Sequence, residues 1–300
     1  MVKGGSQLGQ TRGDRVFEVL IYMGLALTTL IVIYPLIFVI SASLSDPSQI
    51  MKGNVWLWPV DFNFGSYVKV FQNKNILNGY ANTMVYTLLG TAINLLLTTM
   101  IAYPLSRRDF AGRNLITGFM VFTMFFSGGI IPTYLLIRDL GMLNSIWALV
   151  IPGAVSVWNV VIMRTFFQSS IPHEIQESAS IDGCSNIQIL LRIVLPLSMP
   201  IMAVMTLFYS VHHWNAFFNA LIYLNDRDKF PLQLFLREIL IQNEMNDMIQ
   251  VQDESLVKHM MQVEGLKYAV VVVANLPVLM LYPFLQKYFV KGVMVGALKG

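Results

Sequence analysis

The residues best suited to binding chemistry lie in the apolar stretch "FYSVHHWNAFFNALIY". On a helix, steps of 4, 3, 4 and 4 residues place aromatic, imidazole and amide groups on one face: Phe208, His212, Asn215, Asn219 and Tyr223. Such rings can stack on the apolar face of a sugar, and the amides and imidazole can hydrogen-bond its hydroxyls. The same groups equally suit packing between membrane helices, where Asn and His bond a neighbouring helix. The pattern therefore indicates either a translocation path or a helix interface.

Other chemistries find no support in the sequence. His212 and His213 are adjacent, but nothing near them completes a metal site. The only cysteine, Cys184, provides neither a disulfide framework nor a cysteine metal site within this chain. The chain also lacks a phosphate-binding P-loop, an H-E-x-x-H motif and a G-x-S-x-G motif. We therefore expect no enzyme activity, no metal and no cofactor bound by this chain.

A second notable stretch is "FFSGGIIPTYLLI", which carries Gly128, Gly129 and Pro132. Residues of this kind can bend or break a membrane helix, and the freed backbone groups must then be satisfied by protein or by a water-lined cavity. Small residues also permit close helix packing. The stretch is a candidate gate or kink, with close packing as the alternative.

The composition identifies the elements that must position these residues. Of 300 residues, 55% are hydrophobic and 12% are charged, against about 25% charged in soluble domains. We expect an all-α integral membrane protein that binds no nucleic acid. Six apolar blocks have the length of membrane spans: 19–42, 81–103, 115–137, 143–163, 197–223 and 268–285. None contains Asp, Glu, Lys or Arg, which argues against proton-coupled carriers and pumps.

The short basic segments predict the orientation in the membrane. The positive-inside rule places the connection with Arg107, Arg108 and Arg113 in the cytoplasm. The lysines of the C-terminal end agree: Lys287, Lys291 and Lys299. A permease domain over 19–290 would then lie between cytoplasmic tails at 1–18 and 291–300, with connections 43–80 and 225–266 outside and 164–196 inside.

The outer connections differ in character. The first contains "NVWLWPVDFNFGSYVKVF", whose aromatics suit a membrane interface. In the second, Pro231 predicts a helix start, followed by an apolar stripe. The acidic part of the second connection, 243–264, is expected to face water or a partner.

The cytoplasmic connection contains "ESASIDGCSNIQILLRIVLPLSMP", which predicts a helical hairpin. Gly183 fits the stop of a first helix, and Ser185 with Gln188 fits the capping box that starts a second. Their apolar faces are expected to face the bundle and the tip to be polar. The first face would hold Ile171, Ile175 and Ala179, and the second Ile187, Leu190, Leu191 and Val194. A plain re-entry loop is the alternative, but it needs no two capped helices.

This stretch resembles the cytoplasmic EAA signature of permease subunits in binding-protein-dependent ABC importers. The matching residues are Glu177, Ala179, Asp182, Gly183, Leu195 and Pro196, and Ser178 replaces an alanine. The six spans, "HHWNAFFNALIYLND" and the tail "LQKYFVKGVMVGALKG" resemble the maltose-type carbohydrate permease. "FFSGGIIPTYLLI" and "FPLQLFLREILIQN" further resemble the LplC- or YtcP-like subgroup for polysaccharides or complex oligosaccharides.

The resemblance implies a type I ABC importer permease fold in a bacterial cell membrane. Glu177 to Gly183 would be a coupling helix that docks on an ATPase. The implied partners are a second permease subunit, two ATPase subunits that bind ATP and Mg, an extracytoplasmic solute-binding lipoprotein and the sugar. An ATP-independent channel or facilitator is the alternative, because the absence of charge within the spans permits it, but it leaves the hairpin unexplained.

Overall fold

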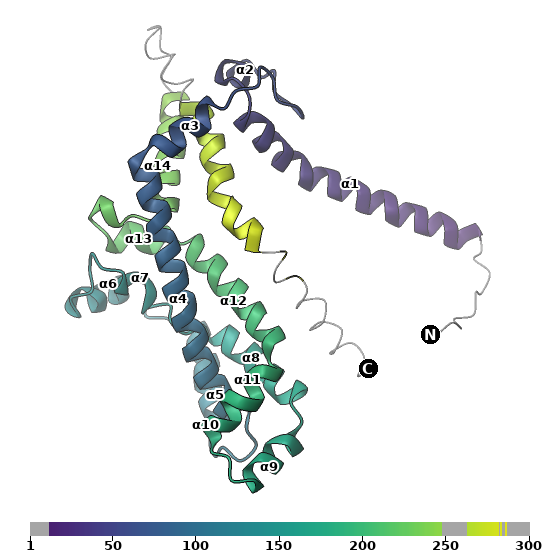
Figure 1. Ribbon diagram of the computed structural model, residues 1–300, viewed down its shortest axis with the longest axis vertical. Helices are drawn as coiled ribbons and strands as arrows, with labels where there is room; N and C mark the ends of the chain where they lie inside the picture. Colours follow the sequence, from purple (N-terminus) through teal and green to yellow (C-terminus); the bar gives the residue numbers. More distant parts are fainter. Residues whose placement is uncertain (1–11, 248–262, 282, 284–285, 287–300) are drawn as a thin grey trace. The chain divides into compact units, whose positions relative to one another are not determined.

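The computed structural model describes residues 12–247, 263–281, 283 and 286, and regular structure within these residues is helical (Figure 1). The chain forms two compact units. The first comprises Met1–Gln72 and Leu240–Val273, and the second comprises Asn73–Ile239 and Ala274–Gly300.

The first unit contains α1 (Arg12–Ser43), α2 (Pro47–Met51) and α3 (Gly65–Gln72). None of the 18-residue apolar window of α1 is buried by protein, so this helix offers an apolar surface to lipid or to another chain. The small core of the unit joins the end of α1 to the following loop through Ala42, Ile50 and Val55. The predicted aromatic connection is exposed here, with Trp58 81% accessible.

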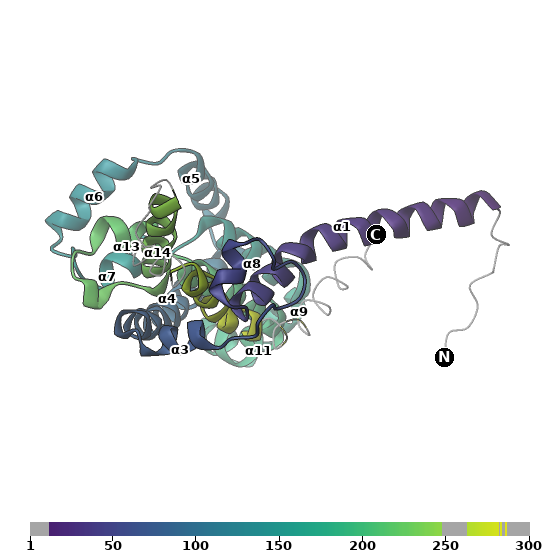
Figure 2. The ribbon, with the colours of Figure 1, turned by 90° about the horizontal axis from the view of Figure 1, so that it is seen from above.

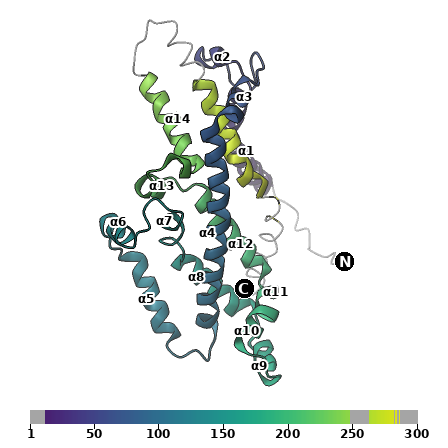
Figure 3. The same cartoon turned by 60° about the vertical axis from the view of Figure 1, so that its left-hand side comes forward.

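The second unit is organised around α4 (Lys74–Ser106), against which α8 (Val157–Ser170) and α12 (Met199–Trp214) pack (Figure 3). Its largest fully buried side chains include Phe167 and Met163 of α8 and Met205 of α12. The interior between α4 and α12 is also polar, which is the arrangement expected where membrane helices approach closely and bond through Thr and Asn.

The predicted third span, 115–137, is a broken helix. It is divided into α5 (Arg113–Phe125) and α6 (Ile130–Asp139), whose axes differ by 109°, and α6 turns away from α5 in Figure 3. Gly129 has φ +87°, a left-handed value that favours glycine because it has no Cβ. Of the two alternatives left by the sequence, the break is the one observed.

The predicted fourth span, 143–163, is wrong as a single helix. It contains α7 (Trp147–Val150), a turn and only the first half of α8. Pro152 and Gly153 lie in the turn, where the missing proline N–H and the flexible glycine disfavour helix continuation. Ser156 then caps α8 by accepting a hydrogen bond from the backbone N–H of Asn159 at 3.4 Å.

The predicted fifth span, 197–223, is also interrupted. α12 ends at Trp214, Asn215 forms its C-cap, and a separate α13 covers Phe218–Tyr223. The Val211 carbonyl accepts both the backbone N–H of Asn215, at 3.1 Å, and the Asn215 side-chain amide, at 3.0 Å, so this residue bonds twice to the last turn of α12. At the other end of α12 the chain turns by 83° beside Ser198.

The remaining boundaries shift by several residues. The predicted spans 19–42 and 81–103 lie within the longer α1 and α4, and the last helix, Val263–Leu281, begins before the predicted 268–285. Of that prediction, residues 282, 284 and 285 lie outside the described residues. The connection 225–266 contains a 3₁₀ turn, Arg227–Lys229, and α14 (Leu232–Asp247), which follows Pro231 as predicted.

Three helices among the described residues are long and apolar enough to cross a membrane, or up to five if each bent pair counts as one span. The predicted six continuous spans are therefore not found in this part of the chain. Most of both predicted tails lies outside the described residues, which exclude 1–11 and 287–300 and with them all three C-terminal lysines. Most of the acidic segment 243–264 lies outside them as well.

Candidate coupling hairpin and substrate path

The connection 164–196, predicted to be cytoplasmic, folds as the expected helical hairpin. α9 (His173–Ile181) is followed by Gly183 with φ +80°, then by α10 (Asn186–Ile189). The Cys184 N–H donates to the Ala179 carbonyl at 3.0 Å and the Gly183 N–H donates to the Ser180 carbonyl at 3.1 Å. These two bonds are those of a Schellman motif, in which glycine supplies the left-handed residue. The predicted helix stop is confirmed.

The second helix starts at the predicted capping box. The Gln188 N–H donates to the Ser185 hydroxyl at 3.3 Å, and the Ser185 N–H donates to the Gln188 side-chain oxygen at 2.8 Å. α10 then continues through a π-helical segment, Leu190–Val194, into α11 (Leu195–Leu197). Helical structure thus runs from the turn of the hairpin to the start of α12, so Leu195 and Pro196 lie in the arm between them.

Buried apolar residues attach the hairpin to the second unit. Ile171, Ala179, Ile189 and Val194 are at most 7% exposed and belong to the main core cluster. Both predicted stripes are wrong in part. Ile175 of the first is 40% exposed, and in the second Ile187 and Leu191 are exposed while Ile189 is buried instead. A π-helical segment begins at Leu190, so residues from this point on, Leu191 among them, depart from the α-helical spacing on which the stripe was predicted.

The exposed side of the hairpin carries further residues of the EAA-like signature. Glu177, Ser178 and Asp182 are exposed, and Glu177 forms an ion pair with His173 at 2.9 Å. The tip is not purely polar as expected, because Ile181 is 86% exposed at its end. An exposed large apolar side chain on a rigid turn is a typical anchor for a partner pocket.

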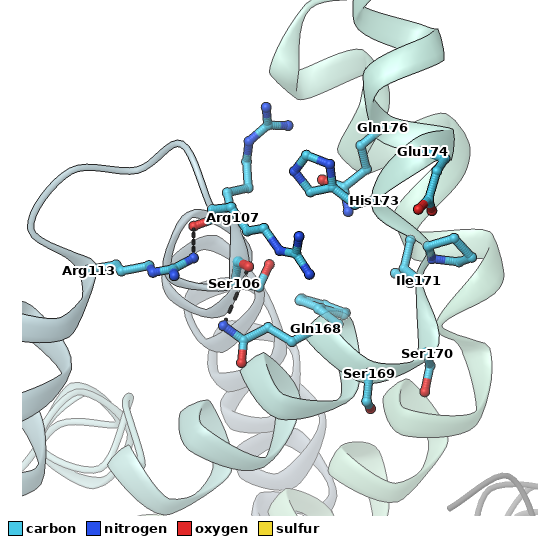
Figure 4. A pocket seen from close by; sticks show the side chains of 13 residues that line it. Ser106, Arg107, Arg113, Gln168, Ser169, Ser170, Ile171, His173, Glu174 and Gln176 are labelled. Carbon is cyan, nitrogen blue, oxygen red and sulfur yellow. Dashed lines mark hydrogen bonds between the residues drawn. The ribbon is translucent and has the colours of Figure 1, made fainter. Parts of the chain in front are cut away.

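A basic pocket of about 600 Å³ adjoins the hairpin where α4 ends and α9 begins. Figure 4 shows Arg107 and Arg113 on one side of it and His173, Glu174 and Gln176 on the other. The sequence identified the arginines only as markers of orientation. Nothing in their spacing indicated a pocket, because its other wall is formed by residues 60 positions further along the chain.

The arginine loop is held in shape by its own ion pair. The Arg107 guanidinium donates two hydrogen bonds to the Asp109 carboxylate, at 2.9 and 2.8 Å, which lower the pKa of Asp109 and raise that of Arg107. Arg113 donates to the Arg107 carbonyl at 2.9 Å. Arg164 likewise donates to the Leu105 carbonyl at 2.9 Å, which satisfies one of the last carbonyls of α4.

The predicted sugar-binding face is not one continuous surface. The interruption at residues 215–217 separates Phe208 and His212 on α12 from Asn219 and Tyr223 on α13. Tyr223 is buried and stacks on Tyr134 with ring centroids 6.2 Å apart. Asn215 lies at the end of α12, where its side-chain oxygen accepts from Gln233 at 3.3 Å. The five residues therefore do not share one helix face as expected.

Phe208 and His212 instead line a cavity of about 300 Å³ together with residues of α8 and of the turn before it. Ser156 and Asn159 at the start of α8 supply further polar groups, and Tyr209 supplies a second ring. Aromatic, imidazole, hydroxyl and amide groups thus meet in one small cavity. These are the kinds of group predicted for the fifth span, but Ser156 and Asn159 take the place of Asn215 and Asn219. Ser156 and Asn159 escaped the sequence reading because the break before α8 was not recognised.

A polar seam between α4 and α12 was also missed. His213 Nε2 lies 2.6 Å from Asn94 Oδ1, and both side chains are buried. The Asn94 amide also donates to the carbonyls of Gly153 and Ala154, each at 2.8 Å. These bonds fix α12 and the turn before α8 on α4, and thereby support the cavity. The sequence signal for this seam is a series of small and polar residues at helical spacing: Thr87, Gly90, Thr91, Asn94 and Thr98.

At the candidate gate, the structure shows open backbone rather than close packing within the described residues. An added Cβ at Gly129 would meet nothing within 4 Å, and one at Gly128 would meet only Pro132, at 3.8 Å. The described residues contain no group of three or more His, Cys, Asp or Glu side chains arranged to hold a metal ion.

Comparison with known proteins places these features in a family. The sequence model described as "Binding-protein-dependent transport system inner membrane component" matches residues 6–295. Protein LplC of Bacillus subtilis (strain 168) is 40% identical over 290 residues, covering 97% of each chain. The polygalacturonan/rhamnogalacturonan transport system permease protein YtcP of the same organism is 41% identical over 289 residues, covering 96% of this chain and 99% of that protein.

A solved structure shows the same fold. A chain of a bacterial ABC transporter involved in the import of the acidic polysaccharide alginate superimposes with a TM-score of 0.84 and 32% sequence identity, over 93% of this chain and 98% of that chain. The long family match and the two relatives at 40% identity or more agree with the type I permease fold. This chain belongs to the family of inner membrane components of binding-protein-dependent transport systems, the permease subunits of ABC importers.

Proposed function

We propose that this chain is the permease subunit through which an ATP-driven importer moves an oligosaccharide into a bacterial cell, with the α9–α10 hairpin as its contact with the ATPase. The observation that carries the proposal is the hairpin itself. It is a rigid turn fixed by a Schellman motif and a capping box, and it presents Glu177, Asp182 and an apolar tip to a partner.

The connection from the hairpin to α12 supports a coupling role. Ile189 and Val194 are fully buried, so displacement of the tip would be transmitted to the packed arm rather than absorbed by a loose loop. The arm enters α12, which carries Phe208 and His212 at the cavity. Closure of an ATPase pair on the tip would thus act on the element that lines the proposed path.

The proposed substrate follows from the cavity and the relatives together. Phe208, Tyr209, His212 and Asn159 combine rings for stacking with groups that hydrogen-bond hydroxyls. YtcP is named for polygalacturonan and rhamnogalacturonan, and the more distant AraQ of Bacillus subtilis for arabinooligosaccharides. The described residues that line this cavity include no lysine or arginine, so a fixed positive charge for an acidic sugar would come from another subunit.

The proposed assembly contains a second permease chain, two ATPase subunits with ATP and Mg, and an extracytoplasmic binding lipoprotein. Both termini would lie in the cytoplasm. The apolar surface of α1 suits contact with lipid or with the second permease chain. The breaks at Gly129 and at Asn215 would form the mobile part of the path, with Gly128 and Pro132 beside the first of them.

The decisive experiment compares two substitutions at the turn. An added Cβ at Gly183 meets nothing within 4 Å in this chain, and Asn and Asp both tolerate the left-handed backbone. Gly183→Asp should reduce both uptake and the amount of ATPase that co-purifies by roughly tenfold, the effect of about 1.4 kcal/mol. Gly183→Asn should retain most of both, because it adds the same shape without charge.

Two outcomes would contradict the proposal. Equal ATPase recovery and normal uptake for Gly183→Asp would exclude a docking surface at this turn. Uptake that survives complete ATP depletion would favour an independent facilitator. Competition between an oligogalacturonate and a neutral arabino-oligosaccharide in the same uptake assay would then determine the charge of the substrate.

A further inference from the structure

The basic pocket beside the hairpin has no role in the proposed docking of the tip. It lies where the last turn of α4, the start of α5, the end of α8 and the start of α9 meet. Three arginines line it: Arg107, Arg108 and Arg113. Polar side chains complete the wall, among them Ser106, Gln168 and Gln176.

The charges of the pocket are not balanced by its own residues. Asp109 neutralises Arg107, whereas Arg108 and Arg113 form no ion pair within the described part of the chain. Glu174 is the one carboxylate among the lining residues, and His173 is already bonded to Glu177. The pocket therefore retains net positive charge and several unused guanidinium donors, which suits a phosphate group.

An apolar groove of about 380 Å³ shares one wall with the basic pocket. Arg107 lines both, so the two spaces lie on either side of this residue. Apolar side chains from α4, from the loop that follows it and from the hairpin arm form most of the groove: Met100, Tyr103, Pro104, Phe110, Ile187 and Leu190. Asn186 also lines it, as does Asp109, whose carboxylate is paired with Arg107. The exposure of Ile187, 69%, is explained if another molecule fills this groove.

We propose that the pocket and the groove together bind one anionic phospholipid, with its phosphate beside Arg108 and Arg113 and an acyl chain along Ile187 and Leu190. A free phosphate would occupy only the basic pocket and would leave the groove empty. An amphiphile uses both, and basic pockets at the cytoplasmic ends of membrane helices are suited to lipid headgroups. The leaflet assigned to the lipid rests on the orientation in the proposed function.

The position of the groove gives the lipid a structural consequence. One wall is α4 and the other is the arm that joins the hairpin to α12. A bound acyl chain would therefore add apolar contact between the fixed axis of the unit and its coupling arm. The importer would then depend on the anionic lipid content of its membrane without any change in the ATPase.

The test uses the complex purified from its membrane and placed in nanodiscs of equal phosphatidylglycerol and phosphatidylcholine. Arg108 is exposed, and its side chain makes no hydrogen bond or ion pair within the described part of the chain, so Arg108→Gln should fold normally. It should weaken retention of phosphatidylglycerol by roughly tenfold, the effect expected for one charged phosphate contact. Arg192→Gln is the matched control, because Arg192 is an exposed arginine of the hairpin arm outside both cavities.

Native mass spectrometry of the delipidated complexes would count the retained lipids, and soluble glycerol 3-phosphate and inorganic phosphate would serve as competitors. Selective loss of phosphatidylglycerol in Arg108→Gln, with weak competition by both soluble anions, supports the proposal. Equal retention in both variants overturns it. Full competition by inorganic phosphate overturns the lipid assignment, and loss of the ATPase without loss of lipid assigns the pocket to a protein contact instead. None of these readouts requires transport, so the lipid site and the importer function fail separately.

Discussion

The hairpin and the α12–α13 segment that carries the candidate substrate path were both predicted from sequence patterns. The structure agrees with the prediction at the turn of the hairpin and differs from it in the α12–α13 segment. In the hairpin, the predicted stop at Gly183 and the capping box at Ser185 are both present. In α12 and α13, the five residues predicted to share a face are divided by a break after Trp214. The first pattern depends on bonds between residues at most five positions apart. The second pattern assumes that one helix continues for sixteen residues.

The comparison shows where local reasoning is safe in this membrane protein. A capping motif contains its own partners, so its residues determine its geometry. A spanning helix can instead be interrupted wherever other helices or a cavity satisfy the freed backbone groups. In the predicted fifth span the helix ends at Trp214, where Asn215 forms the C-cap and bonds back to the last turn, and this was not recognised from hydropathy.

The largest effect is expected at the polar seam between α4 and α12, which supports the cavity lined by Phe208 and His212. A Cβ at Gly90 would overlap the ring of His213, so Gly90→Ala must displace a buried ring and its bond to Asn94. Overpacking and the lost hydrogen bond together should cost about 3 kcal/mol of stability. Thermal unfolding of the detergent-solubilised complex would measure the loss.

Gly118→Ala is the control, because nothing lies within 4 Å of its added Cβ and alanine favours a helix. Unchanged unfolding of both variants would mean that the seam does not hold α12 on α4, and the contrast between the two regions would lose its structural basis.

A smaller effect is expected when the tip of the hairpin is altered. Ile181→Asp places a charge on a residue that is 86% exposed, so the chain should fold unchanged. If the ATPase covers this side chain, its recovery with the purified chain should fall about fivefold or more, corresponding to at least 1 kcal/mol. Ile181→Leu should retain the contact. Undiminished recovery with Asp would show that the apolar tip faces water in the complex.

The sequence predicted much of the fold because its strongest signals are compositional or local. An all-α membrane protein, the ends of α1 and α4 within several residues, the helix after Pro231 and the complete turn at Gly183 all follow from hydropathy and caps. The burial pattern of the second hairpin helix did not follow: Ile187 is exposed in place of Ile189, and Leu191 is exposed within a π-helical segment that departs from the assumed α-helical spacing.

The cavity and the basic pocket were beyond local reasoning for a different reason. Asn159 and His212 are brought together by packing of α8 and α12 on α4, and Arg107 and His173 by the ends of three helices. Such pairs are far apart in the chain and share no period. A single sequence records each residue of the pair but not their proximity.

The two halves of the predicted sugar face should behave differently in uptake. Phe208→Ala and His212→Ala each remove a group from the cavity and should lower uptake several-fold, corresponding to roughly 1 kcal/mol of lost binding. Tyr223→Phe keeps the ring that stacks on Tyr134 and should leave uptake unchanged. Reduced uptake in Tyr223→Phe with normal uptake in both alanine variants would move the path to α13, and reduced uptake in all three would restore the original single-face interpretation.

The smallest effect concerns the capping box, where the local argument itself is tested. Ser185→Ala removes the acceptor of the Gln188 N–H and should destabilise the start of α10 by about 1 kcal/mol. The Gln188 amide should then exchange hydrogen about fivefold faster, since 1 kcal/mol changes an opening equilibrium by about that factor. Ser178→Ala is the matched control, because its hydroxyl donates only to the Glu174 carbonyl within the same helix. If Ser185→Ala leaves the exchange rate unchanged, burial of Ile189 rather than the cap sets the start of this helix, and the success of the local pattern would be a coincidence of packing.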